Sequence, residues 1–391
     1  MKSARLNAVG LLGGILVGFS LAVLLGYQAS TYSKPSRFVR FNQWINPQSV
    51  FFPPFRMLEH LALSRWQPGQ TVVIIAGNSI FNGVSQPVSE IWSQRLQEIL
   101  GPEKYVVVNL SFSGGYPTEA GTLVAESLIR RGIPVLVVCN VATGVPGRPV
   151  GSVYGYYYWE GRAQSALLPY PPRDLDTELW ESNRPEEDRR KQAELRRAAA
   201  LNKYLYFQEL WHHVGLNLFF TVWNFLPQEQ FWRPRNDWPD PEVAPKPVEL
   251  RFRSNLAEEM DIVRRGSREF GVQDEQGRWH MSPSFRDTFA STIHALIPPA
   301  VRPHLLMVLC QNAPYYRSRL TPEEQDRDRI IWEATAALWR EQGIASFVNG
   351  ADYEDADYND RTHLTPSGGR KLAIRVAEEI RRMQSATNPT P

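Results

Sequence analysis

The chain has 391 residues, of which 43% are hydrophobic and 12% aromatic, enough for a sizeable core in one large domain or two ordinary ones. Its 43 basic and 41 acidic side chains leave a formal net charge of only +2. Nucleic-acid binding normally needs a basic face, so this balance argues against such a function, and we expect no nucleic-acid partner.

The N-terminal segment carries a long apolar run. Residues 6–27 contain no charged side chain, and a helix of this length can span a bilayer. Lys2 and Arg5 precede the run, which favours a cytoplasmic N-terminus. We therefore predict a membrane anchor over residues 1–30 that contacts lipid through residues 6–27. The protein would be a single-pass protein of the cell membrane, with its body outside the cytoplasm.

A cleaved signal peptide is the alternative to a retained anchor. Cleavage needs small residues at an A-x-A-like site. The segment Tyr27-Gln28-Ala29 places a bulky ring at that position, which favours retention. Small residues also recur at every fourth position of the run. They would form a smooth stripe for helix pairing, although such residues are common in membrane helices: Gly10, Gly14, Gly18, Ala22 and Gly26.

Beyond a lead-in over residues 31–68, short apolar runs alternate with helical patterns. Runs that are apolar at every position are typical of parallel strands covered on both faces. A capping box at Thr321-Pro322-Glu323-Glu324 marks the start of one helix. The alternation predicts a three-layer α/β fold with a five-stranded parallel sheet. The expected strands are 71–76, 105–110, 134–139, 304–310 and 344–348, and the expected helices are 87–100, 118–131, 321–342 and 365–383.

The alternation is interrupted between the third and fourth expected strands. Residues 151–172 are rich in Tyr, Trp and Pro, and residues 184–203 have the pattern of a charged amphipathic helix. Five prolines over residues 234–247 exclude a regular element there. We interpret residues 145–300 as a mostly helical or irregular insertion that covers the sheet or its mouth, within one body over residues 69–390.

The sequence contains two cysteines, Cys139 and Cys310, each at the end of an apolar run. Such positions suit small buried thiols, and a disulfide between the two is the alternative outside the cytosol. No C-x-x-C pair occurs in the sequence. The acidic stretch over residues 352–360 lacks the central glycine and final glutamate of a calcium loop. We therefore expect neither a metal nor a cofactor.

Two short segments carry the residue types of serine-hydrolase chemistry. Ser79 follows the first expected strand in a glycine-flanked turn, which would present its hydroxyl at the carboxyl edge of a parallel sheet. Asp360 precedes His363 by three residues on a loop before the last expected helix, so the carboxylate can hold the imidazole. Each segment alone is also typical of an ordinary turn. Together they predict a nucleophile, a base and an acid.

The two segments together resemble the SGNH/GDSL hydrolase superfamily. The Gly-Asn-Ser turn that ends at Ser79 is similar to the first block of that family, and Asp360-x-x-His363 is similar to its last. The resemblance covers residues 70–145 and 300–385. It implies a flavodoxin-like three-layer fold and a catalytic triad of Ser79, His363 and Asp360.

The same resemblance implies an oxyanion hole. Its backbone donors would be the N–H groups of Ser79 and Gly114, because Gly114 follows the second expected strand in the place of the family's second block. The chain departs from the family pattern in two places. Asn78 stands where the family has aspartate, and the third block, G-x-N-D, is absent. Asn140 occupies that place as a candidate side-chain donor, with Asn312 in reserve.

Aromatic residues follow the third expected strand on the same edge of the sheet. Tyr156, Tyr157 and Trp159 are candidates for stacking on a sugar ring or lining an acyl pocket. The simpler alternative is that they pack the insertion onto the body.

These observations predict a serine esterase or acyl hydrolase that acts on an extracytoplasmic ester, such as an acylated glycan. The chain also resembles anchored SGNH-like proteins of envelope polysaccharide O-acetylation and teichoic-acid D-alanylation. That resemblance implies, as an alternative, an O-acyltransferase of a cell-envelope polysaccharide that works beside a membrane-bound acyltransferase. A non-catalytic glycan-binding scaffold would retain the same fold. A nucleotide enzyme is disfavoured because no G-x-G-x-x-G or Walker loop follows the first expected strand.

Overall fold

The computed structural model describes residues 2–31, 44–46, 49–50, 55–111, 120–140, 251–252 and 255–387, together with Arg197, Leu201 and residues 204–207. The statements below concern these residues. The described part of the lead-in contains a short antiparallel pair, β1 (Trp44–Asn46) and β2 (Ser49–Val50). The expected helix over 184–203 lies outside the described residues apart from Arg197 and Leu201.

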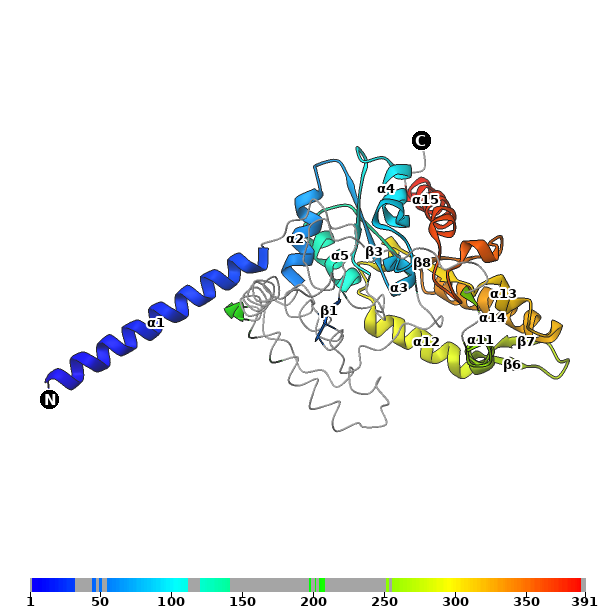
Figure 1. Ribbon diagram of the computed structural model, residues 1–391, viewed down its shortest axis with the longest axis horizontal. Helices are drawn as coiled ribbons and strands as arrows, with labels where there is room; N and C mark the ends of the chain where they lie inside the picture. Colours follow the sequence, from blue (N-terminus) through cyan, green and yellow to red (C-terminus); the bar gives the residue numbers. More distant parts are fainter. Residues whose placement is uncertain are drawn as a thin grey trace, which may run out of the picture.

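A five-stranded sheet forms the centre of the body (Figure 1). Its strands lie in the order β4-β3-β5-β8-β9, and every neighbouring pair is parallel. This arrangement confirms the predicted α/β class and all five expected strands, each within one residue of its expected bounds. The strands are β3 (Thr71–Ala76), β4 (Tyr105–Asn109), β5 (Val135–Asn140), β8 (Leu305–Cys310) and β9 (Ala345–Asn349).

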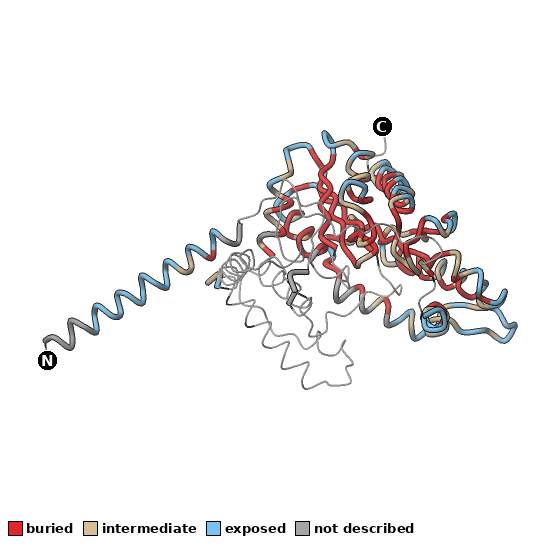
Figure 2. Tube along the Cα trace, in the orientation of Figure 1, coloured by how far each residue is buried: buried red, intermediate tan, exposed pale blue. Residues whose placement is uncertain are grey.

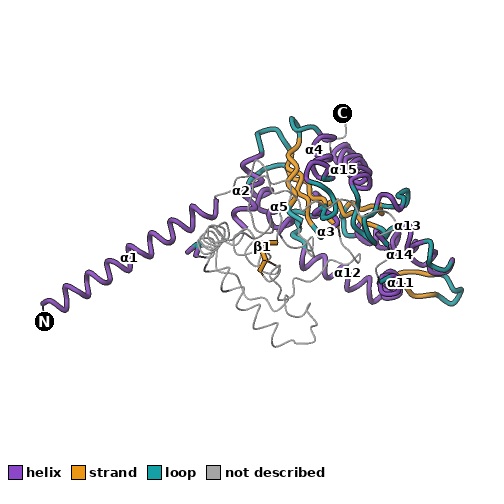
Figure 3. Tube along the Cα trace, viewed as in Figure 1, coloured by secondary structure: helices purple, strands orange, loops and turns teal. Residues whose placement is uncertain are grey.

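Helices cover both faces of this sheet, because successive strand residues point to opposite sides. In β3, Val72 and Ile74 pack into one hydrophobic cluster, and Val73 and Ile75 pack into another. The two clusters make the three layers seen in Figure 3. One face holds α2 (Phe55–Arg65), α5 (Ala120–Arg130), α12 (Pro283–Leu296) and α14 (Pro322–Glu341), and the other holds α4 (Trp92–Leu100), α11 (Leu256–Phe270), α13 (Pro314–Arg317) and α15 (Pro366–Thr387).

The expected helices form with small changes at their ends. The expected helix over 87–100 is divided into a 3-10 turn, η2 (Val88–Glu90), and α4, with Ile91 in extended backbone between them. The capping box before α14 is present, since Thr321 and Glu324 exchange side-chain-to-backbone hydrogen bonds.

Both cysteines are free and buried, so they form no disulfide with each other. Cys139 on β5 pairs in register with Met307, three residues before Cys310 on the neighbouring strand. Cys139 packs on one face of the sheet and Cys310 on the other. Burial raises the pKa of both thiols, that of Cys310 to about 12. They behave as small apolar side chains of the core.

The helix α1 (Lys2–Thr31) extends away from the body as a single rod (Figure 1), and its residues 8–28 are mostly exposed (Figure 2). Within it, residues 8–28 have a mean hydropathy of 2.4, long and apolar enough to cross a membrane. An N-terminal signal sequence meets the same criteria. The structure therefore agrees with a single apolar N-terminal helix, as predicted.

The described part of the insertion forms regular structure against the body. After α11 comes an antiparallel hairpin of β6 (Gly271–Gln273) and β7 (Trp279–Met281), followed by α12. From α12, Phe289 is fully buried, and its ring lies 5.0 Å from that of Trp339 on α14. The described residues between 251 and 300 thus contribute two helices to the body, one on each face of the sheet.

Candidate active site

Ser79 begins a short helix directly after β3. This helix, α3 (Ser79–Asn82), is capped by Asn78, whose side-chain oxygen accepts a hydrogen bond from the Ile80 amide at 3.0 Å. The bend between strand and helix lies at Gly77, with φ of +127°. A Cβ atom there would lie only 2.2 Å from the side-chain oxygen of Asn140. Glycine is therefore required for the turn that presents Ser79.

Asn140 at the end of β5 holds the same turn from the neighbouring strand. Its side-chain oxygen accepts from the Asn78 amide at 3.1 Å, and its Nδ2 donates to the Asn78 side chain at 2.8 Å. Asn140 is completely buried. The carboxamide therefore fixes the backbone one residue before Ser79.

The loop after β9 carries Asp360 and His363. A single antiparallel bridge between Tyr358 and Leu364 closes the loop, and the Asn359 amide donates to the carbonyl of His363 at 2.8 Å. Asp360 also organises the loop backbone, because its Oδ1 accepts from the amides of Thr362 and His363, each at 2.9 Å. The aspartate thus shapes the loop and faces the histidine ring at the same time.

Ser79, His363 and Asp360 meet in one hydrogen-bonded chain. The Nε2 atom of His363 lies 2.7 Å from Ser79 Oγ, and its Nδ1 lies 2.7 Å from Asp360 Oδ2. These atoms come from two segments 284 residues apart in sequence. With the proton on Nδ1 donated to the carboxylate, Nε2 is free to accept from the serine hydroxyl.

The charges and the solvent exposure of these three side chains suit proton transfer. Burial acts to raise the pKa of Asp360, but the hydrogen bonds and charge of His363, with the amides of His363 and Thr362, outweigh it and lower the pKa to about 2. Asp360 is therefore ionised at neutral pH. The His363 side chain is 24% exposed, and Ser79 is also partly exposed, so both reacting atoms lie near solvent.

Further hydrogen bonds join the serine segment to the histidine loop. Asn359 donates through Nδ2 to the Ser85 hydroxyl at 3.1 Å, and Gln86 donates to the Leu364 carbonyl at 3.3 Å. Gln86 is completely buried, and a Cβ atom on Gly369 of α15 would lie 2.7 Å from its side-chain nitrogen. These contacts lie beside the triad and fix the distance between its two halves.

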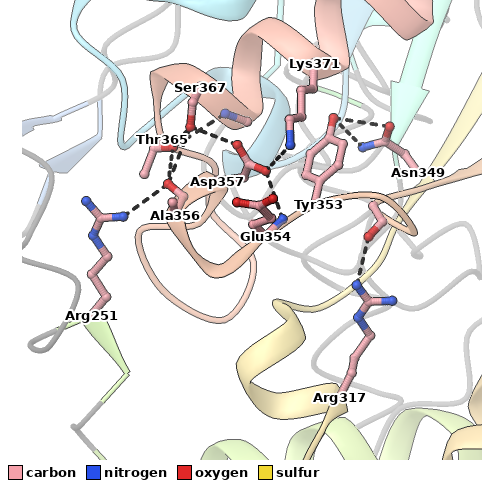
Figure 4. Close-up of polar contacts among 12 residues, drawn as sticks. Arg251, Arg317, Asn349, Tyr353, Glu354, Ala356, Asp357, Thr365, Ser367 and Lys371 are labelled. Carbon is pink, nitrogen blue, oxygen red and sulfur yellow. Dashed lines mark hydrogen bonds and ion pairs between the residues drawn. The ribbon is translucent and has the colours of Figure 1, made fainter.

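Hydrogen bonds and an ion pair attach the acidic stretch before the histidine to α15 (Figure 4). Asp357 is almost fully buried, and it accepts from Lys371 at 2.6 Å, from Ser367 at 2.9 Å and from the Glu354 amide at 2.9 Å. Burial acts to raise the pKa of Asp357, but Lys371, the Glu354 amide and Ser367 together lower it. Thr365 donates its hydroxyl to the Ala356 carbonyl at 2.9 Å. The ion pair with α15 and these hydrogen bonds therefore hold the loop in place.

Residues of the insertion hold the loop from another side. Arg361 lies between Asp360 and His363 in sequence, and its guanidinium pairs with Glu259 of α11 and donates to Asn312 at 2.9 Å. Arg251 donates to the Tyr358 carbonyl at 3.1 Å. The described end of the insertion thus helps to position the loop.

The other expected site residues fall in different places. Gly114, Tyr156, Tyr157 and Trp159 lie outside the described residues, so their expected roles stay predictions. Asn140 lies beside the Ser79 turn, bonded to Asn78, and its role as an oxyanion donor also stays a prediction. Within the described ranges, no group of three or more His, Cys, Asp or Glu side chains is arranged to hold a metal ion.

One positional pattern was missed in the sequence. Each of the five strands is followed or ended by a buried asparagine, and each side chain bonds a residue in a segment that follows β3 or β9. A carboxamide suits these positions because it donates and accepts at once. The signal is visible in sequence as Asn at the end, or two residues beyond the end, of every apolar run: Asn78, Asn109, Asn140, Asn312 and Asn349.

No protein-family model matches the sequence, and no match is found among curated proteins. The structure itself defines a class: an α/β protein with a five-stranded parallel sheet. A Ser–His–Asp hydrogen-bonded chain lies at the carboxyl edge of that sheet.

Proposed function

We propose that this chain is a membrane-anchored serine hydrolase of SGNH type that acts on an ester outside the cytoplasmic membrane. The observation that carries the proposal is the unbroken chain from Ser79 Oγ through His363 to Asp360, with 2.7 Å at each step. This is the geometry that activates a serine hydroxyl. A scaffold without catalysis has no need of three such side chains in line at the solvent-facing edge of a sheet.

In the first half-reaction, Ser79 Oγ attacks the acyl carbonyl carbon while His363 Nε2 takes the hydroxyl proton. The tetrahedral intermediate then collapses. The bond to the leaving alcohol breaks, His363 returns the proton to that oxygen, and an acyl ester on Ser79 remains. Asp360, ionised because its pKa is about 2, stabilises the imidazolium that forms between the two steps.

The developing oxyanion needs N–H donors close to Ser79. The Ser79 amide is the first of α3 and donates to no other described residue, which supports its assignment as one donor. Gly114 is the proposed second donor. Asn140 is the proposed third, through the Nδ2 hydrogen not directed at Asn78.

In the second half-reaction, His363 takes a proton from the acceptor as the acceptor's oxygen attacks the acyl carbon. The bond from that carbon to Ser79 Oγ then breaks, and His363 gives the proton to Ser79 Oγ. Water as acceptor gives hydrolysis, and a glycan hydroxyl gives acyl transfer. Release of free acetate from a model ester without any glycan would identify hydrolysis. Release of the ester's alcohol that requires an added glycan, with the acetyl group recovered on that glycan and not as free acetate, would instead identify transfer.

The location follows from α1. We propose that residues 8–28 stay in the membrane as a retained span, with Lys2 and Arg5 on the cytoplasmic side. The body and its triad then face ester substrates of the cell envelope, with acylated glycans as one class.

The proposal is tested by fluorophosphonate labelling of the full chain in detergent, followed by mass spectrometry of the modified peptide. We expect one adduct, on Ser79. Ser79→Ala should lose the label and at least about 10³-fold of its turnover of a p-nitrophenyl ester, because the nucleophile is gone while the fold is kept. Ser318→Ala, at an exposed serine of the body, is the matched control and should label and turn over normally. An adduct elsewhere, or undiminished turnover by Ser79→Ala, would refute the assignment.

A further inference from the structure

The C-terminal half of α1 is not isolated, because part of the insertion packs along it. The ring of Tyr206 lies 5.3 Å from that of Tyr27, and the ring of Phe207 lies 5.5 Å from that of Phe19. The guanidinium of Arg56 also lies over the Tyr206 ring, 4.6 Å from the ring centre. Two neighbouring residues of the insertion thus contact α1 at points eight residues apart.

The backbones also approach closely at Gly26. A Cβ atom on Gly26 would lie 2.3 Å from the Tyr206 carbonyl oxygen, whereas one on Gly10, Gly14 or Gly18 would meet nothing within 4 Å. Tyr206 itself has φ of +53°, so the chain turns sharply where it meets the helix. Gly26, the last of the small residues at every fourth position, therefore allows the insertion to contact the backbone of α1.

The position of Phe19 fixes how deep this contact lies. The hydrocarbon layer is about 30 Å thick and needs about 20 helical residues. If the layer ended at Phe19, the uncharged run from Leu6 would cover only about 21 Å at 1.5 Å per residue. A span of sufficient length from Leu6 ends near Leu25, which puts Phe19 roughly 9 Å inside the layer. Phe207, in contact with Phe19, lies at a similar depth.

Among the residues described between 201 and 207, the exposed side chains are apolar or aromatic. Leu201 is 60% exposed, Tyr204 56% and Phe207 41%. In water this would be an unfavourable surface. Beside a membrane span, Tyr and Phe instead suit the interface and the hydrocarbon beneath it.

We propose that the segment carrying Leu201, Tyr204 and Phe207 is a second membrane contact, whose partner is the lipid of the leaflet next to the body. Phe207 enters the hydrocarbon beside α1, while Tyr206 and Tyr204 lie at the headgroup level with Arg56. The contact holds the body against the membrane surface. It rests on the part of the proposed function in which α1 is a retained span.

The test places an environment-sensitive NBD label on single cysteines of the full chain in phosphatidylcholine vesicles. Cys139 and Cys310 are buried and have raised pKa values, so they should not compete for the label. The two probes are Phe207→Cys and Tyr204→Cys. We expect the Phe207 probe to be quenched by lipids with a nitroxide on the acyl chain and shielded from aqueous iodide. The Tyr204 probe should respond to nitroxide near the headgroup.

Two positions calibrate the measurement. Leu16→Cys reports on the span itself, and Val272→Cys, on the exposed hairpin of the body, reports on water. Adding Gly26→Leu to the Phe207 probe should expose it to iodide, because the new side chain displaces Tyr206. The matched change Gly14→Leu should leave the Phe207 probe shielded.

The outcomes separate the two levels of the proposal. If the Phe207 probe behaves like Val272 while the Leu16 probe is shielded, the second contact is refuted and the anchor stands. If the Leu16 probe also meets iodide, the anchor and the second contact both fail. Ester turnover measured on the same vesicles reports on the triad independently of either result.

Discussion

At the scale of single residues, the site depends on side chains that fix backbone as much as on those that react. Asn78 caps the helix that begins with Ser79, and Asn140 holds Asn78 through two hydrogen bonds. Both are almost fully buried. Leaving either carboxamide without its partner would cost about 1–3 kcal/mol. The backbone on either side of Ser79 would then lose its support.

The two asparagines should respond differently to a change to aspartate. Asn78→Asp keeps an acceptor for both the Ile80 amide and Asn140 Nδ2, so we expect turnover close to that of the unchanged protein. Asn140→Asp replaces the donating Nδ2 by an oxygen that faces the Asn78 oxygen. It should lower the free energy of unfolding by about 1–3 kcal/mol and reduce turnover. Thermal unfolding and ester turnover of both variants check this. Equal effects would show that the direction of the hydrogen bond is unimportant.

The Asp360 carboxylate should contribute to stability in a defined pH window. Its pKa is lowered from 3.8 to about 2, so the contribution is fully present above pH 3.8 and is lost as the pH falls towards 2. The side chain is 38% exposed, so solvent screening reduces the size of the effect. Urea unfolding of the unchanged protein and of Asp360→Asn should give a stability difference that is constant above about pH 4.5 and shrinks below pH 4.

The control for this titration is His363→Ala, which removes the side-chain hydrogen bond and charge that lower the pKa of Asp360. In that background, the loss should move to higher pH. A difference that stays constant down to pH 2, or one unaffected by His363→Ala, would contradict the assigned cause.

At the scale of elements, the junction between β3 and α3 is tightly constrained. It needs a left-handed backbone and the absence of a side chain at Gly77, because β5 ends directly against it. Only a few residues later, Ser85 accepts a hydrogen bond from Asn359 of the histidine loop, and Gln86 donates one to the Leu364 carbonyl. A shift of this junction would therefore reach both halves of the triad.

Gly77→Ala should destabilise the protein by more than the backbone strain alone, because the added methyl group meets Asn140 at 2.2 Å. Gly132→Ala is the matched control. Its φ is also positive, at +75°, but a Cβ there meets nothing within 4 Å, so the cost should be about 1 kcal/mol. Thermal melts compare the two. Similar melting temperatures would show that the contact with β5 does not constrain the turn.

At the scale of the whole molecule, an α/β body follows one apolar helix. In Figure 1, α1 extends from the side of the body that carries α2, while α15 lies on the far side of the sheet. The triad is assembled by β3 and the loop after β9, both within the body. In the proposed function, α1 sets where the site works, and the body sets its chemistry.

A retained anchor predicts that the mature protein stays in the membrane after alkaline extraction, and that its N-terminal peptide still includes residues 6–27. Leu16→Arg should release it, because a charge at the centre of a span costs about 2.5–3.5 kcal/mol on insertion scales. Fractionation and mass spectrometry of the N-terminus check this. A mature N-terminus near Ala29 would identify a signal sequence instead.

The sequence alone determined the five strands of the central sheet and four of the helices, because each depends on short-range patterns. Fully apolar runs identified the strands, and the capping box at Thr321 marked the start of α14. The two segments carrying Ser79 and His363 were also identified from residue types and spacing. Their meeting was a prediction that only contacts between residues 284 apart could test.

Only the tertiary structure decided how the site is held. The order β4-β3-β5-β8-β9 puts Asn140 beside the Ser79 turn, and it puts Cys139 and Cys310 on opposite faces of the sheet. The pairings of Asp357 with Lys371 and of Arg361 with Glu259 likewise join residues far apart in sequence. Local patterns fix how each segment folds. Strand order and packing, which no local pattern encodes, fix which side chains meet.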